Sequence, residues 1–180
     1  MAKVCYYGKY RAKVHNVDDP EKRGRIRVLC PKVLGDSVSN WCEPCVPVAY
    51  NDGGDLAVPK KDETVWVEFE AGDVNKPIYT GGWWAKEKTP ADPYKVEARY
   101  IEWDGCQIKM EGQNDDNDKA YIEVTVGDVK LLLNEDTIEA SVGDGCKFTM
   151  KKDSIEANVN GNKWTLNNNF SISAQQVHLN

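Results

Sequence analysis

The amino-acid sequence predicts an all-β protein with two regions, a small barrel in the N-terminal half and a series of short paired strands in the C-terminal half. All eight prolines lie between Pro20 and Pro93. Proline is accepted in the loops of a small barrel, but it removes a backbone donor from a long strand ladder. Ten asparagines lie beyond residue 105, where they favour tight turns. A short motif also recurs there every 17 residues, which is typical of a repetitive architecture.

The N-terminal region, residues 1–88, contains short β-rich runs separated by turn residues. In the run from Thr64 to Glu70, polar and apolar side chains alternate, as expected of a strand with one buried face. Asp18-Asp19-Pro20 and Ala71-Gly72-Asp73 supply turns. Five such runs predict a small barrel. The strands are expected at residues 10–17, 24–30, 41–48, 64–70 and 78–84.

Residues 89–104 are predicted to form a linker, and residues 105–180 form the repetitive region. The motif Thr137-Ile138-Glu139-Ala140 recurs at residues 154–157 and 171–174. A second element alternates with this motif, so each repeat is predicted to hold two short strands. The copies of the second element lie at residues 106–110, 129–133, 146–150 and 162–166.

Alternate positions of these C-terminal strands are apolar, and the positions between them are almost wholly polar. Successive side chains of a strand point to opposite faces, so each strand is predicted to present one apolar, inward face. The predicted inward residues are Cys106, Ile108, Met110, Ile122, Val124, Val126, Val129, Leu131, Leu133, Ile138, Ala140, Val142, Cys146, Phe148, Met150, Ile155, Ala157, Val159, Trp164, Leu166, Phe170, Ile172, Ala174, Val177 and Leu179.

A one-sided ribbon of this kind cannot enclose its own apolar face and leaves both edges unpaired. Three identical chains wound around one axis would cover the face and pair the edges. We therefore expect a homotrimer in which residues 105–180 form a triple-stranded, intertwined β-helix. A single-chain β-solenoid and an antiparallel meander folded into a sandwich are the alternatives.

The charge balance argues against nucleic acid as a partner. The chain has 23 basic and 29 acidic residues and a formal net charge of −6, whereas a grip on phosphate backbones depends on clustered Lys and Arg. No apolar run approaches the ~20 residues of a membrane helix. The N-terminus also lacks the apolar core of a secretory signal, so we expect the chain to be made in a cytoplasm.

No catalytic, cofactor or metal site is predicted. The six cysteines show no dense framework and are expected to be reduced. Cys42 and Cys45 have the spacing of a metal knuckle or a redox pair, but tetrahedral zinc needs four ligands and no second pair completes the set. His15 and His178 lie in different regions, so they do not form an imidazole pair. The acidic stretch at residues 111–118 lacks EF-hand spacing and is expected to be a solvated loop.

Four segments of the N-terminal region occur in the order of a known family. They are Tyr10 to Val28, with its Asp-Asp-Pro-Glu-Lys-Arg-Gly-Arg core, Trp41 to Pro47, Lys61 to Asp73 and Asn75 to Trp84. Together they resemble the OB-fold domain of phage baseplate spike proteins and the related type VI secretion spike proteins. The resemblance covers residues 10–84 and includes the family's W-x-x-P and G-D-E-V-W-V-x-F-E-x-G-D patterns.

The resemblance implies a trimeric OB-fold collar under a ring-shaped baseplate hub protein, with a β-helical needle directed at the target cell envelope. It also implies a phage virion or phage-tail-like particle assembled in the bacterial host cytoplasm. Only about twenty residues separate collar and needle, so no lysozyme-type domain is expected between them. Several spikes end in an H-x-H pair that binds iron. Here Val177-His178-Leu179 should place His178 outward, which favours an apolar tip without metal, and an additional tip protein is a candidate partner at this end.

The function expected from sequence is that of a non-enzymatic structural spike, which attaches to the hub and pierces the envelope. The alternative is an OB-fold binding module for oligosaccharide or single-stranded nucleic acid, which the acidic balance disfavours. A wall-degrading enzyme is the third hypothesis, and the absence of P-loop, G-x-S-x-G and H-E-x-x-H motifs counts against it.

Overall fold

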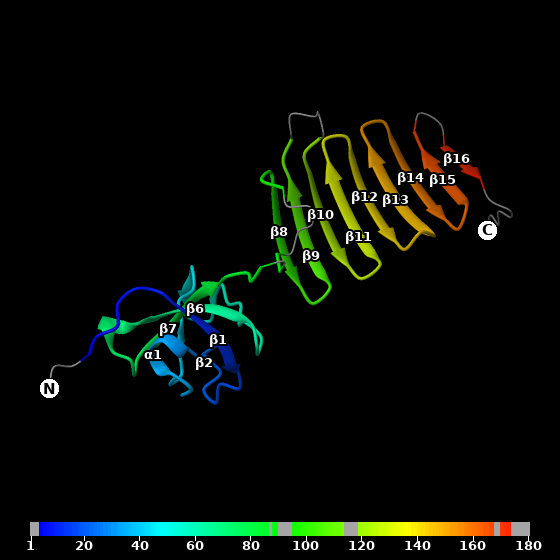
Figure 1. Ribbon diagram of the computed structural model, residues 1–180. Helices are drawn as coiled ribbons and strands as arrows, with labels where there is room; N and C mark the ends of the chain where they lie inside the picture. Colours follow the sequence, from blue (N-terminus) through cyan, green and yellow to red (C-terminus); the bar gives the residue numbers. More distant parts are fainter. Residues whose placement is uncertain (1–3, 87, 90–94, 114–118, 168–169, 174–180) are drawn as a thin grey trace. The chain divides into compact units, whose positions relative to one another are not determined.

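The computed structural model describes residues 4–86, 88–89, 95–113, 119–167 and 170–173, the last four for their backbone only. The chain divides into a front unit, Met1–Thr89, and a sheet unit, Pro90–Asn180 (Figure 1). Apart from two short helical turns, α1 (Pro31–Leu34) and η1 (Glu70–Gly72), the described elements are strands, which confirms the all-β prediction. No described helix has the length and apolar character needed to cross a membrane.

The front unit is built on a five-stranded sheet in the order β2-β1-β6-β7-β3, in which only the β3–β7 pair is parallel. Ile26, just before β2, and Cys42, just before β3, exchange backbone hydrogen bonds of 3.3 and 2.7 Å. These bonds join the two outer strands of the sheet, as a barrel requires. The strands are β1 (Tyr10–Asn16), β2 (Arg27–Leu29), β3 (Glu43–Pro44), β6 (Thr64–Phe69) and β7 (Pro77–Gly82), beside a separate hairpin of β4 (Ala49–Tyr50) and β5 (Gly53–Gly54).

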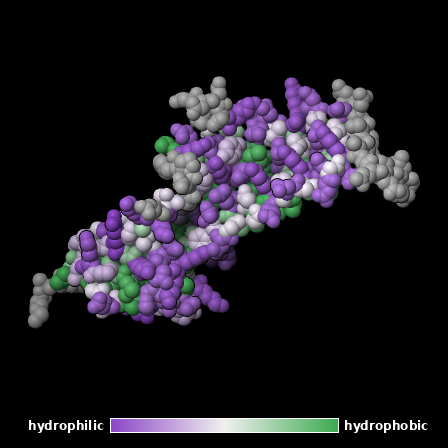
Figure 2. Space-filling view, turned by 45° about the vertical axis from the view of Figure 1, so that its right-hand side comes forward, coloured by the Kyte–Doolittle hydropathy of each residue, from purple (hydrophilic) through white to green (hydrophobic). Residues whose placement is uncertain are grey.

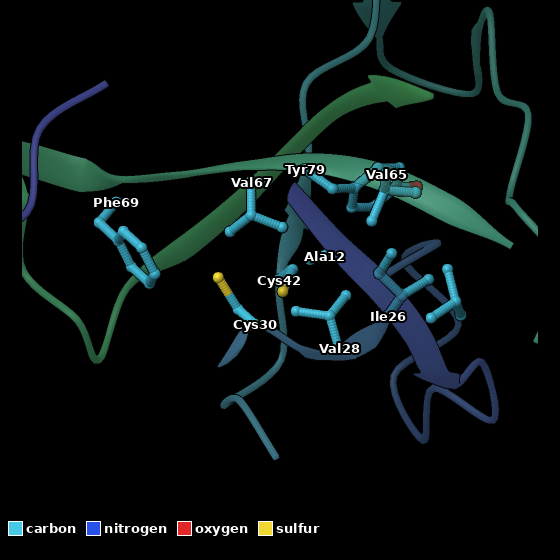
Figure 3. Packing of buried hydrophobic residues seen from close by; sticks show 10 residues of the cluster. Ala12, Ile26, Val28, Cys30, Cys42, Val65, Val67, Phe69 and Tyr79 are labelled. Carbon is cyan, nitrogen blue, oxygen red and sulfur yellow. The ribbon is translucent and has the colours of Figure 1, made fainter. Parts of the chain in front are cut away.

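The core of the front unit is closed by side chains from alternate strand positions (Figure 3). On β6, Val65, Val67 and Phe69 are buried while the residues between them are half-exposed, as the alternation in the sequence predicts. Ile26 and Val28 are fully buried against them. The buried apolar residues are Ala12, Val14, Ile26, Val28, Cys30, Cys42, Val65, Val67, Phe69 and Tyr79.

Asp19 organises the loop between β1 and β2. Its carboxylate accepts hydrogen bonds from the backbone N–H groups of Glu21, Arg23 and Arg25 and from the Arg25 guanidinium, at 2.7 to 3.2 Å. The Arg25 guanidinium and these N–H groups hold the pKa of Asp19 well below its usual range. These bonds hold Arg25 in the loop, and β2 begins only at Arg27. Strand β2 is therefore shorter than the strand at residues 24–30 that the sequence predicts.

The sheet unit is a nine-stranded antiparallel meander in which every strand pairs with its neighbours in sequence. Two strands per repeat, as predicted, are therefore confirmed for the described residues. The strands are β8 (Ala98–Trp103), β9 (Cys106–Glu111), β10 (Tyr121–Val126), β11 (Val129–Asn134), β12 (Thr137–Val142), β13 (Cys146–Lys151), β14 (Ser154–Val159), β15 (Asn162–Leu166) and β16 (Phe170–Ser173).

Two-residue turns connect several of these strands and fix their register. Asp104-Gly105 and Asn160-Gly161 both have positive φ at each residue, 47° and 81° in the first turn and 50° and 87° in the second. Asp-Gly and Asn-Gly are the pairs that accept this geometry, and its twist matches that of the flanking strands. Asn160 and several glycines of the C-terminal half thus lie in hairpin turns.

The structure differs from the sequence analysis in where the sheet begins and in how its strands pair. Strand β8 lies inside residues 89–104, which the sequence analysis assigned to a linker, and it pairs along its whole length with β9. Strands β9 to β15 each have both hydrogen-bonded neighbours within the same chain. Pairing between intertwined chains is therefore not needed for these strands. The described strands form an antiparallel meander, as in one of the two alternatives, but this meander is a single layer and not a sandwich.

Glu111 is the last residue of β9, lies on the polar face of the sheet and is only 6% exposed. Its carboxylate contacts Lys95 Nζ at 2.6 Å, Lys109 Nζ at 2.9 Å and the Tyr121 hydroxyl, which donates to it, at 2.9 Å. Lys109 also donates to the Tyr121 oxygen. The hydrogen bonds from Lys95, Lys109 and Tyr121 lower the pKa of Glu111 to about 2. This residue therefore belongs to strand β9 and not to the solvated acidic loop expected at residues 111–118, of which 114–118 lie outside the described residues.

Truncating a core valine of the front unit is expected to destabilise it, whereas truncating an exposed one is not. Val28 is fully buried and Val48 is 54% exposed, so the same two methyl groups are removed from opposite environments. Val28→Ala should lower the free energy of unfolding of the front unit by about 1.5–3 kcal/mol, and Val48→Ala by less than about 0.5 kcal/mol. Urea unfolding of both variants measures the difference. Equal losses would contradict the assigned core.

Glu111 should make the stability of the sheet unit depend on pH in acid. Because its folded pKa of about 2 lies below its ordinary value of 4.5, the ionised form stabilises the fold above about pH 4.5, and this contribution is lost as the pH falls toward 2. Urea unfolding at pH 6 and pH 2.5 should show a smaller pH-dependent loss in Glu111→Gln than in wild type. Glu139→Gln removes a carboxylate with one lysine partner on the same face, and it is the control against which the effect of Glu111→Gln is compared.

Candidate functional site

The strand register gathers the apolar residues of the sheet unit on one face, in three rows that run across the strands. Each row joins residues directly opposite one another on neighbouring strands. Row 1 contains Trp103, Cys106, Val126, Val129, Val142, Cys146, Val159 and Asn162; row 2 contains Ile101, Ile108, Val124, Leu131, Ala140, Phe148, Ala157 and Trp164; row 3 contains Arg99, Met110, Ile122, Leu133, Ile138, Met150, Ile155 and Leu166.

No described element of the sheet unit covers this face. Each row contains large apolar side chains that are 39 to 61% exposed, from Phe148 and Met150 at the lower end to Ile101 at the upper end. Others in the rows are half-buried, namely Met110, Val124, Leu133, Ile155 and Trp164. A monomeric soluble protein rarely exposes a contiguous apolar patch larger than a few hundred Å². An exposed apolar face of this extent is typical of an interaction surface. It contains the inward residues predicted from sequence, apart from those at 170–180, whose side chains lie outside the described residues.

The opposite face of the sheet is polar and carries its own ion pairs. Lys130 contacts Glu123, Lys147 contacts Glu139 at 2.6 Å and Lys163 contacts Glu156 at 3.0 Å. These pairs recur with the sequence repeat and link strands across successive hairpins. Hydrophilic side chains prevail over the sheet unit in the view of Figure 2. Because this face carries charged side chains, including these three Lys–Glu pairs, it is suited to contact with water.

The cysteine pair suggested by sequence does not form a shared site. Cys42 is fully buried in the front core, whereas Cys45 is exposed. Burial raises the pKa of Cys42 to about 11, so it remains a neutral thiol. Within the described part of the chain, no three His, Cys, Asp or Glu side chains gather to hold a metal ion. His15 is exposed on β1, and His178 lies outside the described residues.

A cation–aromatic cluster on the outside of the front sheet was not found from sequence. The guanidinium of Arg11 lies 5.6 Å from the ring of Trp66 and 4.6 Å from that of Trp83. Arg11 is directly opposite Trp66 on the neighbouring strand, a relation that only the register reveals. Trp83 is half-buried by this packing, while Trp84 is 67% exposed. The adjacent tryptophans thus differ in their surroundings, since Trp83 packs near Arg11 and Trp84 does not.

The family comparison bears on the front unit. A family model described as the type VI secretion system/phage-baseplate injector OB domain matches residues 10–84. A search of curated proteins finds no match to the chain. The matched segment runs from the first residue of β1 to just beyond β7, so it contains the whole five-stranded sheet with its joined outer strands. Residues 10–84 therefore match the type VI secretion system/phage-baseplate injector OB-domain family, and this match supports a baseplate spike OB-domain protein.

Proposed function

We propose that this chain is the structural subunit of a central spike in a contractile injection machine. In this role three copies assemble, the front units attach to a ring-shaped baseplate hub, and the sheet units form a needle that pierces the target cell envelope. The observation that carries the proposal is the uncovered apolar face, which extends over every strand from β8 to β15.

Three copies of one chain suit this face better than a different covering layer. The apolar face has the same width of three residues on successive strands, so a repeated, equally regular surface fits it along its whole length. Three sheets around one axis would bury all three faces in a single core and leave the three polar faces in water. Because the strands already pair within each chain, the walls would meet through side chains and not through shared strands.

The family supports a tail-associated location, in a phage virion or a related particle. A needle that enters an envelope must resist unfolding, and strands β9 to β15 offer no free edge at which opening could start. The role is non-enzymatic, since it requires rigidity and attachment but no reaction. An additional tip protein at the end of the sheet unit beyond β16 fits the same arrangement. Assembly in the bacterial host cytoplasm before release completes the proposal.

The mass of the purified full-length chain tests this proposal directly. One chain is 20.2 kDa, so sedimentation equilibrium should report a species of about 60 kDa that persists on dilution to low micromolar concentration. A compact 20 kDa monomer that excludes hydrophobic dyes would contradict the proposal, because its apolar face would then be covered in some other way.

Lysine substitutions at two adjacent leucines distinguish a buried face from an exposed one. Leu131 lies in the middle of row 2, between Val124 and Ala140, whereas Leu132 lies on the polar face directly opposite Glu123 and Glu139. Leu131→Lys would bury an unpaired charge in the trimer and should cost roughly 3–5 kcal/mol per chain, which converts the trimer to monomer in sedimentation. Leu132→Lys should remain a trimer because its ammonium meets two carboxylates. Trimers of equal stability for both variants would oppose the proposed core.

A further inference from the structure

The two outer rows of the apolar face differ systematically in side-chain size. On the six strands from β9 to β14, every row 1 residue is Cys or Val and every row 3 residue is Met, Ile or Leu. The pairs on one strand, row 1 first, are Cys106 with Met110, Val126 with Ile122, Val129 with Leu133, Val142 with Ile138, Cys146 with Met150, and Val159 with Ile155.

This difference in size matters where neighbouring walls of a needle meet. Rows 1 and 3 lie on opposite sides of row 2, toward opposite lateral borders of the sheet. In a ring with cyclic symmetry, the row 1 border of one copy meets the row 3 border of the next, whereas a twofold arrangement places like borders together. Small residues against large ones fill space evenly. Large against large would overpack one seam, and small against small would leave cavities in the other.

The ends of the two rows on β8 carry a second complementary pair. Row 1 begins with Trp103, which is 49% exposed, and row 3 begins with the exposed Arg99. A depression of about 600 Å³ also runs along row 3 from Arg99 past Met110 and Ile122 to Leu133. A neighbouring copy's Trp103 would therefore find both a hollow and a guanidinium to stack against.

We propose that rows 1 and 3 are the two halves of one seam, which joins each copy to the next in a closed ring of three. This inference rests on the trimer proposed above and adds to it which residues meet. Along the seam, each Cys or Val of row 1 packs against the Met, Ile or Leu of row 3 on the same strand of the neighbouring copy. Cys146 thus lies beside Met150 of the neighbouring copy, and Trp103 lies beside Arg99 of the neighbouring copy.

Disulfide formation at the Cys146 level tests the seam. In a Cys5→Ser, Cys45→Ser background, which removes the exposed thiols of the front unit, Met150→Cys places a thiol in row 3 across from the neighbour's Cys146. Residues 146 and 150 of one chain lie roughly 13 Å apart along β13, beyond the roughly 4.4–6.8 Å that a disulfide spans between Cα atoms. A bond between Cys146 and the cysteine at position 150 can therefore form only between copies. A mild oxidant such as diamide accepts the two electrons and two protons released for each bond.

Complete oxidation of Met150→Cys should give a covalent trimer on a non-reducing denaturing gel, with a covalent dimer only as an intermediate. The background without Met150→Cys should stay at 20 kDa, because Cys106 and Cys146 then face methionines. Leu133→Cys is the matched control. It adds a row 3 thiol on β11, which is two strands, or roughly 9–10 Å, from β9 with Cys106 and from β13 with Cys146. This variant should therefore also stay monomeric on the gel.

The outcomes separate the seam from the trimer itself. A 60 kDa species in sedimentation whose Met150→Cys variant gives no covalent trimer would overturn the seam and leave the trimer standing. Covalent dimers as the end product, or dimers through Cys146 in the background chain, would indicate like borders together and also overturn it. A monomer in sedimentation before oxidation would remove the proposed function as well.

Discussion

The structure of the sheet unit depends on one constraint, which is that a single-layered sheet with one apolar face cannot be stable in water without a cover. The two units meet the need for a core in different ways. Among the residues that the structure describes, the ten that form the buried hydrophobic core all belong to the front unit, which encloses them within one chain. In the sheet unit, the only buried side chains among the described residues are those of Glu111 and Thr149, and both are polar. The backbone of the sheet unit has hydrogen-bonded neighbours, whereas many of its apolar side chains remain exposed.

Much of this arrangement follows from local pattern. The alternation in Thr64–Phe69 placed β6 and its buried face correctly, and the 17-residue repeat placed the hairpins β11 to β15. The apolar face of each strand was also predicted, because a period of two leaves no choice of face once the strand is recognised. Asp-Gly and Asn-Gly turns then fix the register of the hairpins. Alternation, repeats and turn pairs each involve residues close together in the sequence, so they can be recognised without knowing which strands pair.

The features that sequence analysis missed depend on which strand lies beside which. Strand β8 was assigned to a linker because Pro90 and Pro93 precede it, although Ile101 and Trp103 already alternate with polar residues. The stacking of Arg11 on Trp66 and Trp83 requires the pairing of β1 with β6. The cluster around Glu111 requires strands β9 and β10 to lie side by side, and it requires Lys95, which precedes β8, to contact the same carboxylate. Charged and aromatic residues of this kind have no periodicity, so their contacts become visible only with the sheet topology.

The size difference between the lateral rows says more about assembly than the apolar character of the face does. Apolar character alone requires a cover and is satisfied by any apolar partner. A consistent small border and a consistent large border, separated by a central row that alternates Ala140, Phe148, Ala157 and Trp164, make the face complementary to a rotated copy of itself. Such complementarity has a direction, and a directed contact that repeats must close into a ring or continue as a filament. In the proposed trimer the contact closes after three copies, and the central row of each wall would then face the axis that the three walls share.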